Sequence, residues 1–205
     1  MAERYCTVAD EGHAIFTERG SRFIAHATPI TDVEDAEKFI EAVQAEYPDA
    51  SHTVPAYRVR PRHEYCDDDG EPSGSAGRPV LNVLRQEGIE NVGVVVIRYF
   101  GGTELGIGGL SRAYSRVARE AVADAGIVER IPREQFTVVV DYDDSGTVRS
   151  VLESAGAEFE AEYAEQVTVK VTVPAEEADT LRERLRSATH GRARLSGECN
   201  SSTGD

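Results

Sequence analysis

The sequence predicts an α+β protein with two domains, and three observations support this. A nearly continuous apolar run from Val92 to Tyr99, bounded by Asn91 and Gly101, indicates a strand buried on both faces. Apolar stripes at helical spacing alternate with such strands through the first 125 residues. After Pro132 the predicted order becomes strand, helix, strand, strand, helix, strand. A length of 205 residues suits one large domain or two small ones.

The elements of the first half follow from apolar spacing and from turn residues. Residues 22–27 indicate a strand and residues 32–47 a helix, which Thr31 or Asp32 caps and Pro48 ends. Residues 53–60 alternate in polarity as a strand does, whereas residues 67–74 are too rich in Asp, Gly and Pro for regular structure. The remaining elements are a helix at 76–86, the strand at 92–99, a glycine loop at 101–109 and a helix at 110–125.

The second half has a clearer pattern. It predicts a strand at 136–142, a helix from Asp144 or Ser145 to residue 155, strands at 157–163 and 166–173, a helix at 174–189 and a last strand at 192–197. This order is the split βαβ arrangement of a ferredoxin-like domain. We therefore expect one domain over residues 1–131, a second over residues 132–199, and a mobile polar tail over residues 200–205.

The composition is acidic and strongly biased towards arginine. There are 22 basic and 37 acidic residues, a formal charge of −15, and Lys38 and Lys170 are the only lysines. Such a composition suits a cytosol rich in salt and predicts a halophilic archaeon as the source. A GC-rich genome is the alternative cause of the arginine bias.

Several classes of protein are disfavoured at this stage. No window holds the ~18 consecutive apolar residues of a membrane-spanning helix, and the first residues lack the basic and apolar regions of a secretory signal. Cys6, Cys66 and Cys199 are odd in number and widely spaced, so they predict neither a disulfide framework nor a metal site. We expect a cytoplasmic protein without membrane association.

The middle of the chain is neutral although the protein is acidic. Residues 58–120 carry nine basic and nine acidic side chains, and every basic one is Arg. Arginine forks onto phosphate and carboxylate groups, which favours an anion-facing surface. The alternative is that a core-rich segment has less surface to carry acidic residues.

An acidic, glycine-containing turn lies within this segment. The run Asp67–Asp69 could bind a hard cation, but it lacks the ligand spacing of a calcium loop. A structural turn is favoured over a partner surface or a metal site, with Arg78 and Arg98 as candidate ion-pair partners. Small residues after the turn leave backbone amides open at a helix start, which is a plausible anion pocket. The motif-turn residues are Asp68, Asp69, Glu71, Ser73 and Ser75.

The second constellation is the strand end at Arg98 with the glycine loop that follows. A strand, a glycine loop and a helix can bring backbone amides and a positive helix end to one point. Neither a Walker loop nor GxGxxG is present, since Ser111 takes the third glycine's place. The alternative is that the glycines only permit positive φ angles and close packing. The predicted anion- or nucleic-acid-binding residues are Arg78, Arg98, Tyr99, Gly101, Gly102, Gly106, Gly108, Gly109, Arg112 and Arg116.

No catalytic residue and no cofactor is predicted. The five histidines are scattered, and none is paired with Cys or Ser in a nucleophile signature. Asp67 next to Cys66 favours a raised thiol pKa, which disfavours a nucleophile. The sequence leaves enzymatic activity open and favours a protein that is not an enzyme.

The two glycine segments resemble those of the IMPACT/YigZ family. The matching stretches are residues 21–25, 68–79, 95–102 and 105–114, and the resemblance covers residues ~20–125 firmly. In one departure, the family's His-x-Cys-x-Ala segment here has Val54 in place of the cysteine. That departure argues against a thiol-dependent function.

The resemblance implies an N-terminal domain like domain 2 of ribosomal protein S five, with four strands and helices on one side. It also implies a C-terminal domain resembling the ferredoxin-like domain of elongation factor G. Eukaryotic relatives regulate translation initiation under stress by competing for an activator of an initiation-factor kinase, with an extra N-terminal domain for protein contacts. We do not expect that partner role here, but contact with the translation apparatus or with RNA is implied.

Two functional hypotheses follow. The first is a non-catalytic, translation-associated regulator that binds RNA or a ribosomal surface in a cleft where residues 68–78 and 98–112 converge. The second is an enzyme or binder of a phosphorylated small molecule or nucleotide, because the same superfold hosts the GHMP kinases and residues 105–111 faintly resemble their phosphate loop. An interaction module whose glycines are purely architectural is a third option, with an unknown protein partner.

Overall fold

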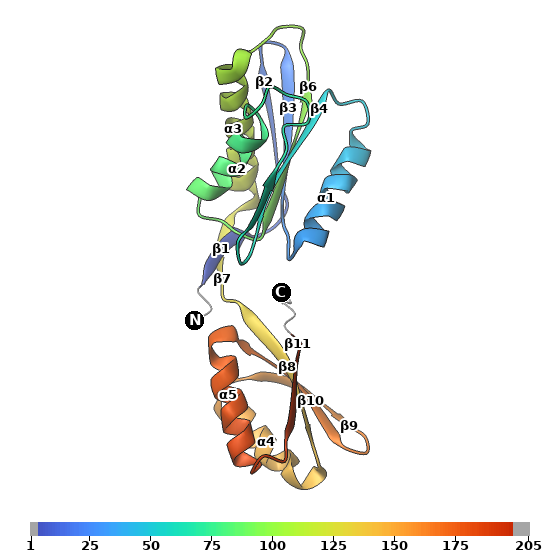
Figure 1. Ribbon diagram of the computed structural model, residues 1–205, viewed down its shortest axis with the longest axis vertical. Helices are drawn as coiled ribbons and strands as arrows, with labels where there is room; N and C mark the ends of the chain where they lie inside the picture. The colour runs from blue at the N-terminus through green and yellow to red at the C-terminus, as the bar shows by residue number, and fades with distance from the viewer. Residues whose placement is uncertain (1–3, 199–205) are drawn as a thin grey trace. The chain divides into compact units, whose positions relative to one another are not determined.

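The computed structural model describes residues 4–198, and these divide into two compact units (Figure 1). The first unit runs from Tyr5 to Arg130, and the second is made of residues from Ile131 onward. Among the described residues, no helix combines the length and the apolar character needed to cross a membrane. The predicted tail, residues 200–205, lies outside the described residues.

The first unit is built around one antiparallel sheet with the strand order β2-β3-β6-β4-β5, while β1 pairs with β7 in a separate ribbon. Its strands are β1 (Tyr5–Val8), β2 (Gly12–Glu18), β3 (Ser21–Pro29), β4 (His52–Val59), β5 (His63–Cys66), β6 (Val92–Tyr99) and β7 (Ile127–Arg130). Its helices are α1 (Val33–Glu46), α2 (Gly77–Gln86) and α3 (Gly106–Ala125).

The central strand β6 is buried on both faces, as its continuous apolar run predicts. Val94 and Val96 pack into the core beneath α2 and α3, whereas Val95 and Ile97 pack beneath α1. Helices therefore cover both faces of the sheet (Figure 1). The resemblance implies four strands with helices on one side, but the sheet has five strands and α1 lies opposite the other helices. The second apolar face of β6 gives the apolar stripe of α1 a surface to cover.

Local signals place most helix ends. Asp32 caps α1, because its carboxylate accepts the backbone N–H of Asp35 at 2.9 Å. α3 begins at Gly106 rather than at the predicted Leu110, so half of the glycine loop is helical. Gly106 has a φ of +69°, which lets the chain turn directly into the helix. Strands β1, β2, β5 and β7 are not predicted from the sequence, since they are short or have mixed polarity.

The second unit has the predicted βαββαβ order. Its elements are β8 (Arg133–Val140), α4 (Tyr142–Ser154), β9 (Glu158–Tyr163), β10 (Val167–Pro174), α5 (Ala175–Ala188) and β11 (Arg194–Glu198). The strand order is β11-β8-β10-β9, and all pairs are antiparallel. Alternate residues such as Val138 and Val169 form the core with Leu152 of α4 and Leu185 of α5. The α+β class with a ferredoxin-like second domain is confirmed.

A chain of hydrogen bonds crosses the α1 side of the first sheet. His13 Nδ1 lies 3.0 Å from His26 Nδ1, and His26 Nε2 lies 3.1 Å from the hydroxyl of Tyr47. A bond between two ring nitrogens needs one donor and one acceptor, so it cannot survive when both rings are protonated. Burial, followed by the neighbouring His13, lowers the pKa of His26, while Glu46 and Glu11 partly oppose the shift.

We predict that the protein loses stability as the pH falls below ~6.5, partly through His26. Its folded-state pKa lies below the unfolded value of ~6.5, so the unfolded state binds the proton more readily as the pH falls. The stability that neutral His26 contributes is fully present above its unfolded-state pKa. It is lost as the pH falls through its folded-state pKa. Urea denaturation at several pH values measures it. The slope of the unfolding free energy against pH should become shallower in His26→Gln. It should stay unchanged in the control variant His63→Gln, which alters an exposed histidine.

Candidate functional site

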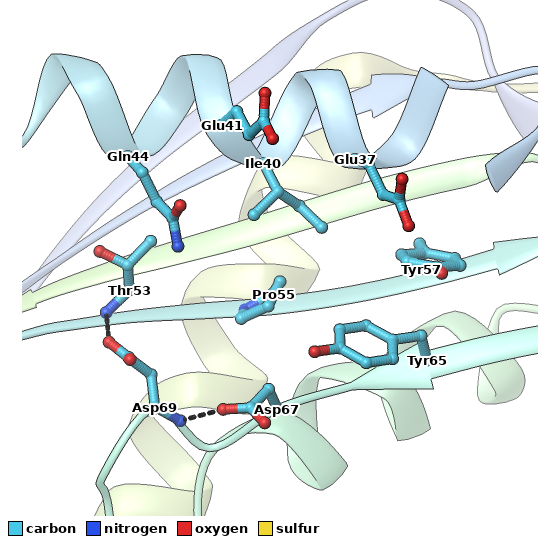
Figure 2. A pocket seen from close by; sticks show the side chains of 10 residues that line it. All are labelled: Glu37, Ile40, Glu41, Gln44, Thr53, Pro55, Tyr57, Tyr65, Asp67 and Asp69. Atoms are coloured by element: carbon cyan, nitrogen blue, oxygen red, sulfur yellow. Dashed lines mark hydrogen bonds between the residues drawn. The ribbon is translucent and has the colours of Figure 1, made fainter. Parts of the chain in front are cut away.

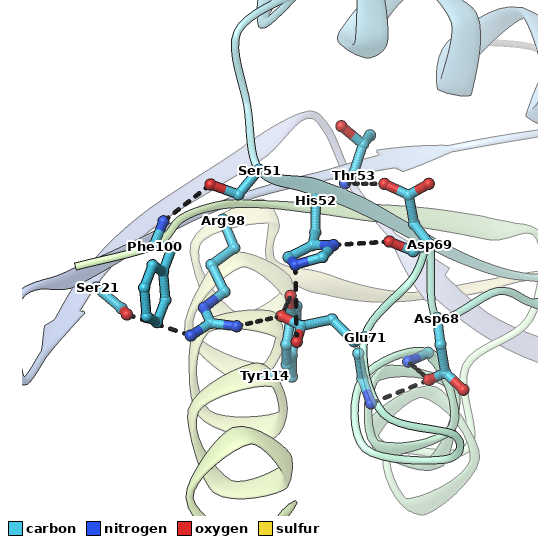
Figure 3. Close-up of polar contacts among 12 residues, drawn as sticks. Ser21, Ser51, His52, Thr53, Asp68, Asp69, Glu71, Arg98, Phe100 and Tyr114 are labelled. Carbon is cyan, nitrogen blue, oxygen red and sulfur yellow. Dashed lines mark hydrogen bonds and ion pairs between the residues drawn. The ribbon is translucent and has the colours of Figure 1, made fainter. Parts of the chain in front are cut away.

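The two glycine-containing segments that the sequence singles out meet beside the end of β6 (Figure 3). Arg98 Nη1 lies 2.6 Å from Glu71 Oε1, and the hydroxyl of Tyr114 donates to the same oxygen at 2.7 Å. Ser111 Oγ also donates to the backbone carbonyl of Ser75 at 3.4 Å. Residues 68–78 and 98–114 are therefore joined by side-chain contacts.

Arg98 is enclosed rather than open to a ligand. It is 4% exposed and Glu71 is 7% exposed, so each neutralises the other away from water. A second guanidinium nitrogen donates to Ser21 Oγ at 3.3 Å, and the ring of Phe23 lies 5.6 Å from the guanidinium carbon. Burial, then the neighbouring Glu71, raises the pKa of Tyr114 and keeps its hydroxyl a donor. The anion that Arg98 binds in this structure is the chain's own Glu71.

The anion pocket predicted at the start of α2 is filled by a carboxylate of the same turn. Asp68 accepts the backbone N–H groups of Gly74 at 2.6 Å, Ala76 at 3.1 Å and Gly77 at 2.8 Å. Burial alone would raise the pKa of Asp68, but these amides, with Arg78 nearby, hold it below its usual value. The open amides that the small residues indicate are thus satisfied internally.

The other carboxylates of the turn also fold back onto the protein. Asp69 accepts the backbone N–H of Thr53 at 2.6 Å, and its carbonyl oxygen lies 2.7 Å from Nδ1 of His52. Asp67 accepts the backbone N–H of Asp69 at 2.7 Å. These contacts are those of a structural turn. Within residues 4–198, no group of three His, Cys, Asp or Glu residues is arranged to hold a metal ion.

The glycines of the loop after β6 divide into two kinds. Gly101 packs against the turn before β3, where a Cβ atom would lie 1.9 Å from the carbonyl carbon of Gly20. Gly102 and Gly106 have φ angles of +82° and +69°, and nothing lies within 4 Å of where a Cβ would be. Gly101 is therefore needed for close packing, whereas Gly102 and Gly106 turn the chain at an open surface.

The start of α3 is open. It has no side-chain cap and no acidic residue in its first turn, and Gly106, Ile107 and Gly108 are exposed. Arg112 folds towards this turn, because Nη1 of its guanidinium lies 3.4 Å from the position of a Cβ at Gly108. The exposed Phe100 lies on the same connection between β6 and α3.

The remaining predicted residues lie elsewhere. Tyr99 points to the α1 side of the sheet, where its hydroxyl donates to Asp49 at 3.1 Å. Arg116 lies over the ring of Phe16, 4.0 Å from its centroid, and pairs with Glu120 at 2.9 Å. Four predicted residues remain. Arg78 and Ser73 are exposed around the start of α2, while Ser75 is fully buried and Gly109 is half-buried.

Sequence reasoning missed Ser21 and His52 as members of the buried network and Ile107 as an exposed apolar side chain. An arginine at the end of an apolar strand does signal the need for a buried partner. Nothing in the local pattern indicates which carboxylate or hydroxyl supplies it, because Ser21 is 77 residues from Arg98.

Cys66 is a poor candidate nucleophile. It is only partly buried, and burial followed by the nearby Asp68 raises the pKa of its thiol. This direction is the one that the sequence indicates, and it disfavours the reactive thiolate at neutral pH.

Comparison with known proteins places these features in a family. Residues 19–122 match the model of the Impact N-terminal domain, and residues 138–192 match a domain of unknown function, DUF1949. The chain is 34% identical over 197 residues to the IMPACT family member YvyE of Bacillus subtilis, covering 94% of this chain and 90% of that protein. It is 31% identical to the IMPACT family member YigZ of Escherichia coli, covering 85% and 88% of the two chains.

A solved structure supports the architecture. The crystal structure of a hypothetical protein superposes with a TM-score of 0.72 at 28% sequence identity, covering 97% of this chain and 98% of the other. Both units of the fold therefore occur in one known chain.

We predict that Glu71→Gln destabilises the protein by about 3–5 kcal/mol, because it leaves the Arg98 guanidinium buried without a counter-charge. Chemical denaturation gives the change in unfolding free energy. The double variant Arg98→Met/Glu71→Gln should recover part of the loss, since no uncompensated charge remains.

The control for this variant is Glu120→Gln, which breaks the exposed pair with Arg116 and should change stability by less than ~0.5 kcal/mol. Equal losses in Glu71→Gln and Glu120→Gln would contradict the role assigned to the buried pair.

Proposed function

This chain belongs to the IMPACT family, and on that basis we propose that it is a non-catalytic regulator associated with translation. It binds RNA or a ribosomal surface through the exposed start of α3. The association with translation rests on the family resemblance, and the location of the surface rests on the geometry of this chain.

The observation that carries the proposal is the open start of α3. The first four N–H groups of a helix have no partner inside it, and the helix dipole makes this end positive. Most helix starts are closed by a capping side chain or carry acidic residues in the first turn. α3 has neither, and the nearest acidic residue is Glu104, just before its N-cap residue Leu105. Exposed glycines at 106 and 108 let a phosphate oxygen approach these amides without meeting a side chain.

Arg112 adds an exposed positive charge at the same place. Three arginines project from the exposed side of α3: Arg116 pairs with Glu120, and Arg119 pairs with Glu87. Within the described chain Arg112 has no carboxylate partner, and its guanidinium lies against the first turn. A guanidinium without an internal partner can bind a phosphate with two hydrogen bonds.

Two exposed apolar side chains belong to the same segment, Phe100 on the connection from β6 and Ile107 in the first turn of α3. Phe100 is 50% exposed and Ile107 is 63% exposed, and the guanidinium carbon of Arg98 lies 5.4 Å from the Phe100 ring centroid. An exposed aromatic ring next to a phosphate-binding point can stack on an unpaired base. The surface therefore combines phosphate contacts with a stacking contact.

Electrostatics constrains the conditions of binding. A chain of formal charge −15 repels nucleic acid at long range, although residues 58–120 are neutral. Salt shortens this repulsion to a few ångströms near 1 M, which leaves direct contacts to decide the affinity. We predict a halophilic source from the composition. We also predict that binding to RNA or to a ribosomal surface persists at high salt.

The second unit offers a weaker platform for RNA. The sheet face turned away from the core carries Thr137, Thr168 and Thr172 together with the basic residues Lys170 and Arg194, and none of the described residues on this face is aromatic. Alternate residues of the edge strand β9 are Glu158, Glu160 and Glu162, which repel phosphate. These residues favour the start of α3 as the contact surface.

We predict that Arg112→Ala lowers affinity for ribosomes or structured RNA about fivefold to tenfold and reduces the salt dependence by about one counterion. Filter binding and ribosome co-sedimentation at several salt concentrations measure both quantities. The matched control is Arg149→Ala, which removes the same charge from an exposed pair with Glu153.

If RNA or ribosomes retain the wild type, Arg112→Ala and Arg149→Ala equally, the start of α3 is not the binding surface. Stabilisation of the wild type by ATP and magnesium, without binding to RNA, would instead support the alternative of a nucleotide or phosphorylated small molecule.

A further inference from the structure

A second candidate site lies on the other face of the first sheet. A pocket of about 340 Å³ opens between α1 and the strands β4 and β5 (Figure 2). Ile40 of α1 and Pro55 of β4 form its apolar base. The start of α3 lies on the opposite side of the sheet, so this pocket is separate from the proposed anion-binding surface.

The charged groups around the pocket are all acidic. Glu37 and Glu41 reach it from α1, and Asp67 and Asp69 reach it from the segment after β5. Of the described residues that line it, none is basic. Asp67 and Asp69 each accept one backbone N–H, which leaves most of their acceptor capacity free. Four carboxylates around one cavity favour the entry of a cation.

An unpaired hydroxyl on a buried side chain provides a second indication of a ligand. Tyr57 is only 4% exposed, and it lines the pocket beside Glu37 (Figure 2). Among the described residues, its hydroxyl group has no hydrogen-bond partner. Burial, then Glu37, raises the pKa of Tyr57, so the group remains a neutral phenol whose oxygen accepts hydrogen bonds. A hydrogen-bond donor on a ligand in the pocket could bond to this oxygen.

The aromatic wall favours a flat cation. The rings of Tyr57 and Tyr65 are stacked, with centroids 5.3 Å apart and an angle of 25° between their planes. Tyr65 is 41% exposed, so one edge of this wall is open to a ligand. A guanidinium is planar, is weakly hydrated, stacks on aromatic rings and forks onto carboxylates, whereas an ammonium is a strongly hydrated point charge.

We propose that this pocket binds an alkyl-guanidinium group, with the cation between the carboxylates of α1 and those after β5, its plane against the tyrosine wall and one N–H donated to Tyr57. The apolar base at Ile40 and Pro55 receives the alkyl stem. The same chemistry is supplied by a free guanidinium compound or by an arginine side chain of a protein.

Isothermal titration calorimetry of the whole protein at low salt tests the proposal with four probes. These are agmatine and the acetylated, amidated peptides Gly-Arg-Gly, Gly-Lys-Gly and Gly-citrulline-Gly. We expect agmatine and the arginine peptide to bind once per chain, and the neutral citrulline peptide to bind at least about tenfold more weakly. If agmatine binds as tightly as the arginine peptide, the ligand is assigned as a free guanidinium compound. If the peptide binds much more tightly, the ligand is assigned as an arginine side chain of a protein. Either result supports the pocket.

Variants locate the binding. Glu37→Gln/Glu41→Gln should weaken arginine-peptide binding at least about tenfold. The control Glu176→Gln/Glu177→Gln makes the same charge change at exposed positions of α5 and should stay within about twofold. Tyr57→Phe should weaken binding about threefold without loss of thermal stability, because its hydroxyl has no partner to lose in the free protein.

Three results would overturn the proposal: unchanged binding in Glu37→Gln/Glu41→Gln, equal weakening in the α5 control, or a lysine peptide that binds more tightly than the arginine peptide. The first two would show general attraction to an acidic protein, and the third would exclude recognition of the guanidinium plane.

Discussion

A buried ion pair between Arg98 and Glu71 is the contact on which the first unit's architecture depends. It joins the end of β6 to the motif turn, and Tyr114 fixes the same carboxylate from α3. A guanidinium cannot be held among apolar side chains without a counter-charge and hydrogen bonds. The turn must therefore fold over the strand end, and this position brings the start of α2 beside α3.

Most of the hydrogen-bond donors that the sequence analysis assigns to an external anion are instead bonded to carboxylates of the same chain. Asp68 accepts three amides at the start of α2, and Glu71 accepts Arg98 and Tyr114. Because such donors are satisfied within the protein, they hold the fold together instead of binding a ligand. What remains open is the start of α3, where no acidic residue is present in the first turn.

The two faces of the first unit thus differ in chemistry. The α3 side combines uncapped amides with Arg112, which favours phosphate. The α1 side gathers carboxylates and the tyrosines Tyr57 and Tyr65, which favours a cation. β6 separates them, since its side chains alternate between two apolar layers. An anionic partner and a cationic group could therefore be bound together without competing for one surface.

The sequence by itself determined the α+β class, the buried strand β6, a helix cap at Thr31 or Asp32 and the βαββαβ order of the second unit. Each depends on local periodicity or on neighbouring residues. Only the tertiary structure decided which polar groups are open. Arg98 and Arg112 look alike in the sequence, yet one is buried against Glu71 and the other is exposed. The difference arises from contacts between residues far apart in the chain, which local spacing does not encode.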